Sequence, residues 1–453
     1  MSNTVKGRAW RAGGLLLLFC CSFSRLSLAE DAKEGDVPIS ASAPVPDPHK
    51  VQDPTGATTG VDHGANFAGA AKPGVPTIEE LTNQVSKGRA GLNILWTCLA
   101  GFLVFFMQAG FALVETGFTR AKNASHTMLM NMMVFCIGFI GYFICGFAFM
   151  FGGLGTLGTL GGSSLLDGMY SIGGWNLLGT KGFFMNGLFD SQVLAFYMFQ
   201  MVFMDTAATI PTGSMAERIK FSAFIWMSFF LTMITYPIIG CWVWGGGWLS
   251  QMGAKWGLGS GAVDFSGSGV IHMVGGFTAL AGAMVLGPRI GKYDKNGNAR
   301  PIPGHDIPMA IVGTIILFFG WFGFNAGSTL AATDGILPVA AVNTMVAGAF
   351  GGFSAMLYMM FVHPARKPDP SMCCNGVLAG LVAITAPCAF VSPMAAVLIG
   401  IVAGIWVIIA ATFVENTLKI DDPVGAFAVH GCNGLLAFYA SDYFPVVPIM
   451  RTE

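Results

Sequence analysis

Long apolar segments with almost no charge dominate this chain and restrict what it can fold into. Ten of them are long enough to cross, as helices, a hydrocarbon core about 30 Å thick. Only 10% of the residues are charged, against about 25% in soluble domains. The sequence therefore predicts an all-α, polytopic membrane helix bundle. Its ten spans are expected near residues 90–114, 128–151, 190–213, 219–245, 266–287, 307–330, 336–362, 373–391, 394–415 and 423–441.

The basic residues between these segments predict the orientation of the bundle. Alternate connections hold 11 basic residues, whereas the intervening ones hold only Lys181 and Lys255. Connections rich in Lys and Arg face the cytoplasm in membrane proteins, so we expect the N-terminus on the extracytoplasmic side. The cytoplasmic set is Arg120, Lys122, Arg218, Lys220, Arg289, Lys292, Lys295, Arg300, Arg366, Lys367 and Lys419.

The two ends of the chain differ in composition from the apolar part. Basic residues, an apolar run ending at Cys20 and small residues up to Ala29 are typical of a secretory signal peptide. A retained anchor helix is the alternative. The next stretch is rich in Pro, Ala, Asp and Gly, which indicates disorder. We expect a signal peptide (1–29), a disordered extracytoplasmic segment (30–87), a transmembrane domain (88–445) and a short C-terminal tail (446–453).

An Asp and a His eight residues apart occur in two of the apolar segments. Asp264 precedes His272 in one, and Asp422 precedes His430 in the other. One such histidine would more simply be a satisfied core residue, but ionisable groups at membrane depth mark functional sites. Two copies on oppositely directed helices predict an inverted repeat of five plus five spans, with the histidines meeting near the midplane. Small residues behind the first histidine are expected to allow close packing: Gly275, Gly276 and Gly282.

A set of aromatic residues is expected near the outer side of the bundle. The set comprises Phe199, Phe203, Trp244, Trp321 and Phe324, with Ser328 one turn beyond Phe324. Each of them alone is better explained by helix packing or by the aromatic belt at the membrane interface. Glu115, near the inner end of its segment, is expected to serve the basic surface around Arg120 and Lys122.

Six fragments carry a resemblance to a known family. They are FALVETGFTRAKN, AERIKFSA, VWGGGW, DFSGSGVIH, GWFGFNAGS and DDPVGAFAVHG. In their order and spacing the chain resembles the ammonium transporter family, the Amt, Mep and Rh group, over roughly residues 88–441. The resemblance implies a homotrimer in the cell membrane, in which each subunit has its own narrow pore.

The resemblance also assigns roles to individual residues. It implies that NH4+ is recruited at an outer aromatic site, deprotonated, and passed as NH3 along a hydrophobic pore with twin histidines. The implied substrates are ammonium and ammonia, with methylammonium as a further candidate. The implied sites are recruitment by Trp244, Ser328, Phe203 and Asp264, a gate of Phe203 and Phe324, and pore lining or proton relay by His272, His430, Trp321 and Phe199.

The chain departs from the family pattern in three places. Ser266 and Ser268 stand where small Ala and Gly are frequent, and Gly425 stands where some bacterial members carry an acid. Members also have an eleventh helix and a cytoplasmic regulatory tail, neither of which follows before Glu453. The resemblance therefore does not extend to binding of cytoplasmic regulators, and a truncated, non-functional transporter is one alternative.

Two further classes of protein remain open from the sequence. One is an ammonium sensor with little flux, and the other is a haem protein with His272 and His430 as axial ligands. The ten Cys residues show no metal-binding spacing, so we expect no metal site. We also expect no cofactor and no enzymatic activity. A net charge of −1 argues against nucleic acid as a partner.

Overall fold

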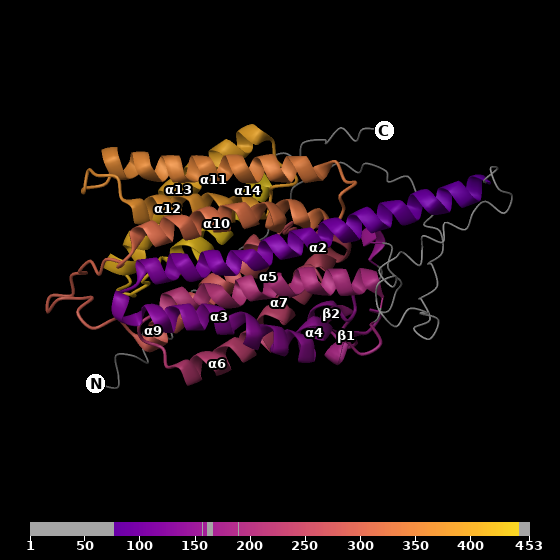
Figure 1. Ribbon diagram of the computed structural model, residues 1–453, viewed down its shortest axis with the longest axis horizontal. Coiled ribbons are helices and arrows are strands. Elements are labelled where there is room, and N and C mark those ends of the chain that lie inside the picture. The colour runs from indigo at the N-terminus through magenta and orange to yellow at the C-terminus, as the bar shows by residue number, and fades with distance from the viewer. Residues whose placement is uncertain (1–76, 156, 161–165, 189, 444–453) are drawn as a thin grey trace, which may run out of the picture.

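The helices of the chain run side by side along one axis (Figure 1). The computed structural model describes residues 77–155, 157–160, 166–188 and 190–443. The expected signal peptide and C-terminal tail lie outside these residues. Eight described helical segments are long and apolar enough to cross a membrane, and two shorter apolar helices, Pro370–Thr385 and Phe427–Phe438, accompany them. The predicted all-α membrane bundle is therefore confirmed.

Each predicted span coincides with an apolar helical segment. The helices are α2 (Ile78–Phe118), α3 (Ala124–Gly141), α4 (Phe147–Phe151), α5 (Ser191–Met215), α6 (Phe221–Phe230), α7 (Tyr236–Val243), α8 (Trp248–Trp256), α9 (Val274–Leu286), α10 (Ile307–Asn325), α11 (Ile336–Phe361), α12 (Pro370–Thr385), α13 (Pro393–Asn416) and α14 (Asn433–Tyr443). Four π-helical turns interrupt or begin them: η3 (Tyr142–Gly146), η6 (Leu231–Thr235), η7 (Ser268–Met273) and η9 (Phe427–Cys432). Short 3-10 turns complete the described helices: η2 (Ala121–Asn123), η4 (Gly158–Leu160), η5 (Phe183–Met185) and η8 (Ala326–Thr329).

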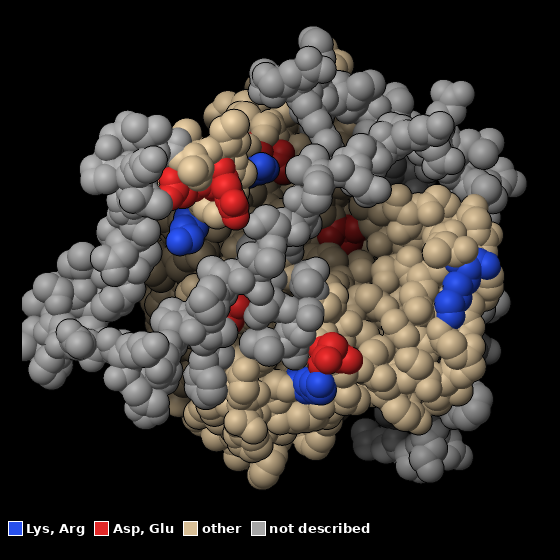
Figure 2. Space-filling view, turned by 90° about the vertical axis from the view of Figure 1, so that its right-hand side faces the viewer, with Lys and Arg blue, Asp and Glu red and all other residues tan. Residues whose placement is uncertain are grey.

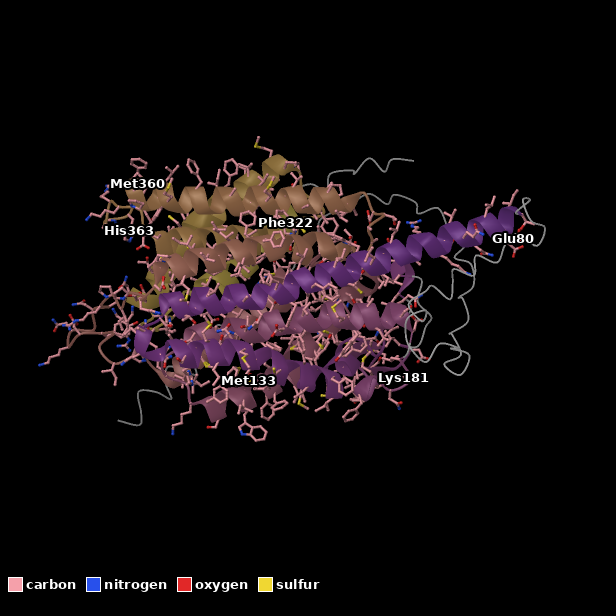
Figure 3. The ribbon with its side chains drawn as sticks, viewed as in Figure 1. Glu80, Met133, Lys181, Phe322, Met360 and His363 are labelled. Atoms are coloured by element: carbon pink, nitrogen blue, oxygen red, sulfur yellow. The ribbon has the colours of Figure 1, made fainter. Side chains whose placement is uncertain are left out.

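The helix α2 begins earlier than the composition of its first residues suggested. The Thr77 side chain accepts from the Glu80 amide, and the Glu80 carboxylate accepts from the Thr77 amide. This reciprocal capping box starts a helix inside the segment expected to be disordered up to residue 87. With 41 residues at 1.5 Å each, α2 is roughly 60 Å long. It consequently projects beyond the bundle at the end where Glu80 lies (Figure 3).

The connections alternate between the two ends of the bundle as predicted. Lys181 lies at the same end as Glu80, whereas His363 lies at the opposite end (Figure 3). The Lys181 end carries a hairpin of β1 (Met169–Ile172) and β2 (Trp175–Gly179), whose register shifts between Tyr170 and Ser171. Its turn has positive φ at Gly173 and Gly174, as a tight hairpin turn requires. Few Lys and Arg side chains are visible on this face (Figure 2).

Close contacts between glycine backbones join the two repeats. A Cβ on Gly276 of α9 would lie 2.3 Å from the Gly431 nitrogen of η9, so the two segments meet without side chains between them. Gly275 and Gly282 instead make room for side chains of α5, those of Ile210 and Met215 respectively. The expected close packing behind His272 is confirmed. Small residues at such crossings allow membrane helices to approach at backbone distance.

Candidate functional site

The repeated Asp–His spacing has a structural cause, because each aspartate caps the helix that carries its histidine. The Asp264 carboxylate accepts from four backbone amides: those of Gly267, Ser268, Gly269 and Val270, at 2.8–2.9 Å. The Asp422 carboxylate accepts from Ala426 at 3.0 Å and from Phe427 at 2.8 Å. The capped segments are the π-helical turns η7 and η9, which contain the two histidines. Turns of this kind occur frequently at functional sites.

This geometry gives Asp264 a positioning role beside Trp244. Its carboxylate faces the helix, and the residue is 4% exposed. Its carbonyl oxygen accepts from the Trp244 indole nitrogen at 2.6 Å, which fixes the indole ring over the start of η7. A Cβ on Gly267 would lie 3.1 Å from that ring, so the glycine leaves room for it. Asp264 therefore holds the Trp244 ring in place, and its predicted contact with a cation stays a prediction.

The two serines that depart from the family pattern hold η7 against other helices. Ser268 donates to the Val382 carbonyl at 2.7 Å and accepts from the Ala386 amide at 2.7 Å. Ser266 donates to the Asn325 carbonyl at 3.4 Å. Both hydroxyls are buried. They therefore add fixed contacts around Asp264.

A column of buried aromatic rings leads inward from Trp244. The Phe203 ring lies 6.3 Å from the Trp244 ring and stacks on Phe324 with centroids 4.3 Å apart and planes 13° from parallel. Phe199 contacts Phe203 at 4.4 Å. Phe203 and Phe324 are at most 1% exposed. The two stacked rings consequently close the column at this level.

The histidine pair lies directly beneath the stacked rings. His272 stacks on Phe324 at 5.4 Å and on Trp321 at 5.2 Å. The Nδ1 atoms of His272 and His430 are 3.1 Å apart, a distance at which one ring donates and the other accepts. Both residues are buried, and the His272 Nε2 atom has no hydrogen-bond partner among the described residues. The sequence prediction that the two histidines meet is confirmed.

Two hydroxyl groups also contact residues of this column. Thr385 accepts from the Trp321 indole nitrogen at 2.9 Å, and sequence reasoning missed it. A buried indole needs such a partner, so a Thr inside an apolar segment was the available signal. The Ser328 hydroxyl donates to the Phe324 carbonyl at 2.7 Å, which leaves its oxygen able to accept from a donor in the outer site.

Glu115 does not serve the surface of Arg120 and Lys122 as expected. It is 3% exposed, and it accepts from Asn131 at 2.7 Å and from Thr212 at 2.8 Å. Position along the segment placed the residue near the inner end, but the side chain turns into the bundle, where two polar residues of other helices reach it. Arg120 instead pairs with Glu217.

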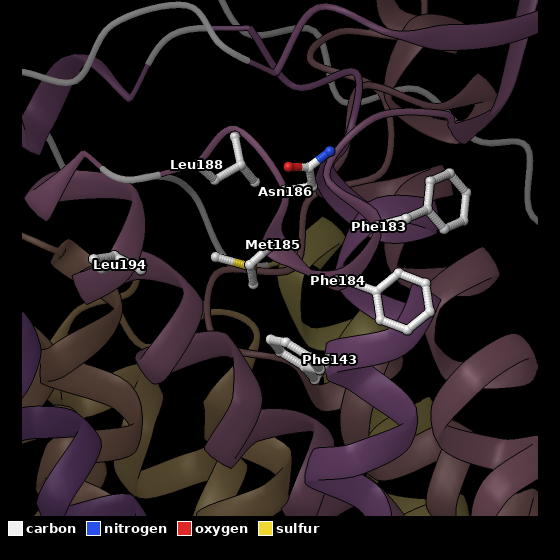
Figure 4. A pocket seen from close by; sticks show the side chains of 7 residues that line it. All are labelled: Phe143, Phe183, Phe184, Met185, Asn186, Leu188 and Leu194. Carbon is white, nitrogen blue, oxygen red and sulfur yellow. The ribbon is translucent and has the colours of Figure 1, made fainter.

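An apolar pocket lies outside the aromatic column. It has a volume of about 660 Å³ and a largely apolar lining (Figure 4). Its lining residues are Phe143, Phe183, Phe184, Met185, Asn186, Leu188 and Leu194. None of these residues belongs to the predicted site.

Charged residues that follow α5, α9 and α13 form a buried ion-pair cluster. Arg289 bonds Asp421 through Nε at 2.9 Å and through Nη2 at 3.0 Å, and it reaches Glu217 at 3.1 Å. Arg218 donates to the Asp421 carbonyl at 3.0 Å. Burial alone raises the pKa of the Asp421 carboxyl, but the hydrogen bonds and charge of Arg289 outweigh it and hold the pKa below its ordinary value. The cluster ties the ends of α5, α9 and α13 together.

We expect Asp421→Asn to destabilise the protein at neutral pH by about 3 kcal/mol. The variant removes the only described carboxylate paired with Arg218 and leaves buried Arg289 with Glu217 alone. The native pKa is lowered from an unfolded value of about 3.9. The contribution is therefore fully present above that value and is lost as the pH falls through the native pKa. Thermal unfolding in detergent from about pH 7 to about pH 3 measures this. The exposed pair of Asp167 and Lys181 provides a matched control, since Asp167→Asn should leave the midpoint unchanged. Equal effects of both variants would contradict the buried cluster.

Membrane-length helices around a closed column of aromatic rings and a histidine pair define a polytopic membrane transport protein. The sequence matches the Ammonium Transporter Family over residues 95–446. It is 44% identical over 379 residues to the ammonium transporter Amt2 of Archaeoglobus fulgidus, covering 83% of this chain and 75% of that protein. The chain belongs to the ammonium transporter family.

Two solved structures share this fold. A sensor Amt protein superposes with a TM-score of 0.71 at 39% identity, covering 80% of this chain and 84% of that one. Mep2 of Candida albicans superposes with a TM-score of 0.66 at 29% identity, covering 78% of this chain and 73% of that one. Both similarities extend over most of the described bundle.

Proposed function

We propose that this protein carries ammonium across a membrane, accepting NH4+ at the outer aromatic site and passing NH3 beneath the stacked rings. One observation carries the proposal: a buried, hydrogen-bonded histidine pair, with Nδ1 atoms 3.1 Å apart, lies under stacked Phe203 and Phe324. Family membership and the relatives' names support the same substrate. The functional roles of the individual residues are part of the proposal.

The energetics favour separating NH4+ into NH3 and a proton. A cation over aromatic faces gains about 0.5–2 kcal/mol, enough to concentrate ammonium at Trp244. Moving a bare ion into low dielectric has an idealised cost of order 20 kcal/mol, so the column favours neutral NH3. Potassium has no proton to release. This difference would let the pore discriminate between two cations of equal charge.

The histidine pair is proposed to carry the released proton. Two charged rings at 3.1 Å would repel each other, so the pair holds at most one proton at a time. Each imidazole can donate through one nitrogen and accept through the other. The unpartnered Nε2 of His272 is available to the passing molecule.

The proposal includes an orientation and an assembly. Basic connections such as those holding Arg289 and Arg366 face the cytoplasm, and the segment before α2 is extracytoplasmic. The protein is multi-pass in the cell membrane and assembles as a homotrimer surrounded by lipid. Methylammonium would follow the same route, because it also carries a proton that can be released.

Uptake and current measurements in proteoliposomes test this proposal. We expect an ammonium pulse to evoke flux that an equal potassium pulse does not. Trp244→Leu combined with Ser328→Ala should weaken apparent ammonium affinity by roughly 1–3 kcal/mol, since an indole face and a hydroxyl are lost. The Trp256→Leu variant alters an exposed tryptophan at the same end and serves as the control. No flux from folded wild type, or unchanged affinity in the double variant, would contradict the proposal.

A sensor with little flux is the second candidate. The observation favouring it is the likeness to a sensor Amt protein at a TM-score of 0.71. Such a protein would bind ammonium at the outer site without passing it. Ammonium-dependent thermal stabilisation together with absent flux would distinguish it from a transporter.

A further inference from the structure

Glu115 is a buried acidic residue that the proposed transport route does not use. It lies on α2 at 3% exposure, inside the membrane-spanning part of the bundle. No ion pair found among the described residues includes it. An ionisable group in such a place carries an energetic penalty and marks a functional site.

A small cavity connects this carboxyl to the histidine pair. It encloses about 20 Å³, and Glu115, Asn375 and His430 are the polar side chains that line it. A cavity of roughly 10–15 Å³ is enough for one water molecule, so this one fits a single molecule of NH3 or NH4+. A Cβ on Gly213 would lie 3.2 Å from the Glu115 carboxyl group, so the α5 backbone closes directly against it.

The groups bonded to Glu115 all act as donors towards it. Asn131 donates through Nδ2, while its Oδ1 accepts from Thr209 at 3.0 Å, so the amide is oriented by both neighbours. Gln108 in turn donates to the Thr209 hydroxyl at 2.9 Å. Thr212 is the second donor to the carboxylate. A carboxylate has about four acceptor sites, so positions remain for a further donor from the cavity.

We propose that Glu115 forms an inner ammonium-binding site, in which its carboxylate is the counter-charge for NH4+ re-formed beneath His430. The inference rests on the proposed transport function. One N–H bond breaks at the outer site, and the proton moves to the histidine pair. NH3 then reaches the cavity and accepts that proton from the pair, so one N–H bond forms and the imidazole becomes neutral again. The outer site holds the cation by aromatic faces, whereas the inner site holds it by a full negative charge.

Side-specific transport measurements with Glu115→Gln test the inner site. Transport is measured in right-side-out and inside-out vesicles. We expect the ammonium concentration for half-maximal transport from the cytoplasmic face to rise by about tenfold or more, since a charged hydrogen bond is lost. Half-saturation from the outer face should stay within about twofold, because an outer site built on aromatic faces does not use this charge. Glu115→Asp keeps the charge and should give an intermediate value. Glu415→Gln, at a partly exposed carboxylate paired with Lys292, is the matched control.

The possible outcomes separate this inference from the transport proposal. A Glu115→Gln variant with wild-type half-saturation on both faces would overturn the inner site while leaving transport intact. Wild-type vesicles without flux would overturn the transport proposal. The inner site is then tested by the shift in the thermal unfolding midpoint that ammonium chloride causes, minus the shift caused by an equal concentration of potassium chloride. A smaller ammonium-dependent midpoint shift in Glu115→Gln than in Glu415→Gln supports the inner site, and equal shifts reject it. If the Gln variant does not fold, the same comparison is made with Glu115→Asp.

Discussion

Replacing either His272 or His430 by Ala should reduce ammonium-evoked current by at least about tenfold, since a positioned proton-transfer group contributes roughly a hundredfold or more. The two rings share one hydrogen bond at 3.1 Å. Removing one therefore breaks the relay and leaves a buried nitrogen of the other without a partner, at a cost of about 1–3 kcal/mol. The protein should still fold, because the π-helical turns are capped by Asp264 and Asp422 and not by the histidines.

The measurement pairs current with potassium leak in proteoliposomes at matched protein amounts. If water fills the space left by the imidazole, selectivity against potassium should fall as well. An acidic replacement at His272 should go further, because a fixed negative charge would stabilise a cation and admit potassium. His363→Ala, at the opposite end of the bundle from Lys181 (Figure 3), controls for loss of a histidine elsewhere. Wild-type current and selectivity in both pore variants would make the pair purely structural.

Most features that the sequence predicted correctly depend on one segment at a time. Apolar length determines whether a helix can span a bilayer. The orientation predicted from the basic loops stays a prediction. The meeting of His272 and His430 was also predictable. Equal distances from each capping aspartate place both rings at similar depth when the two helices run in opposite directions.

The features that the sequence did not reveal depend on which way a side chain turns. Asp264 was expected at the outer vestibule, but its carboxylate points back into four amides of its own chain. Glu115 was expected to face the basic surface, but Asn131 and Thr212 approach it from two other helices. Residues on separate helices are related by packing, and a sequence pattern along one helix does not contain that information.

The early start of α2 could have been predicted from the sequence. Thr77 and Glu80 have the spacing of a capping box, which starts a helix even where the following residues are largely polar. The average composition of residues 30–87 indicates disorder, because two capping residues contribute little to an average over so long a stretch. Gly425 has a φ of 79°, which favours glycine, so an acidic residue would be strained at this position.

The second large effect is expected from Asp264→Ala, which should lower the stability of the bundle by about 4 kcal/mol or more, since buried amides left without partners cost about 1–3 kcal/mol each. Four amides at the start of η7 lose their acceptor in this variant. A membrane interior offers them little water as a substitute. The Trp244 indole should also lose its fixed position, because it donates to the carbonyl of the same residue.

The repeat supplies the matched comparison for this prediction. Asp422 accepts from only two amides, so Asp422→Ala should shift the thermal unfolding midpoint in detergent by about half as much, if each lost acceptor has a similar cost. Asp264→Asn retains one acceptor oxygen and should lie between wild type and Asp264→Ala. A direct ammonium contact at Asp264 predicts another pattern, in which Asp264→Asn keeps the wild-type midpoint but loses affinity. Observing that pattern would show that the carboxylate meets the cation and that capping is secondary.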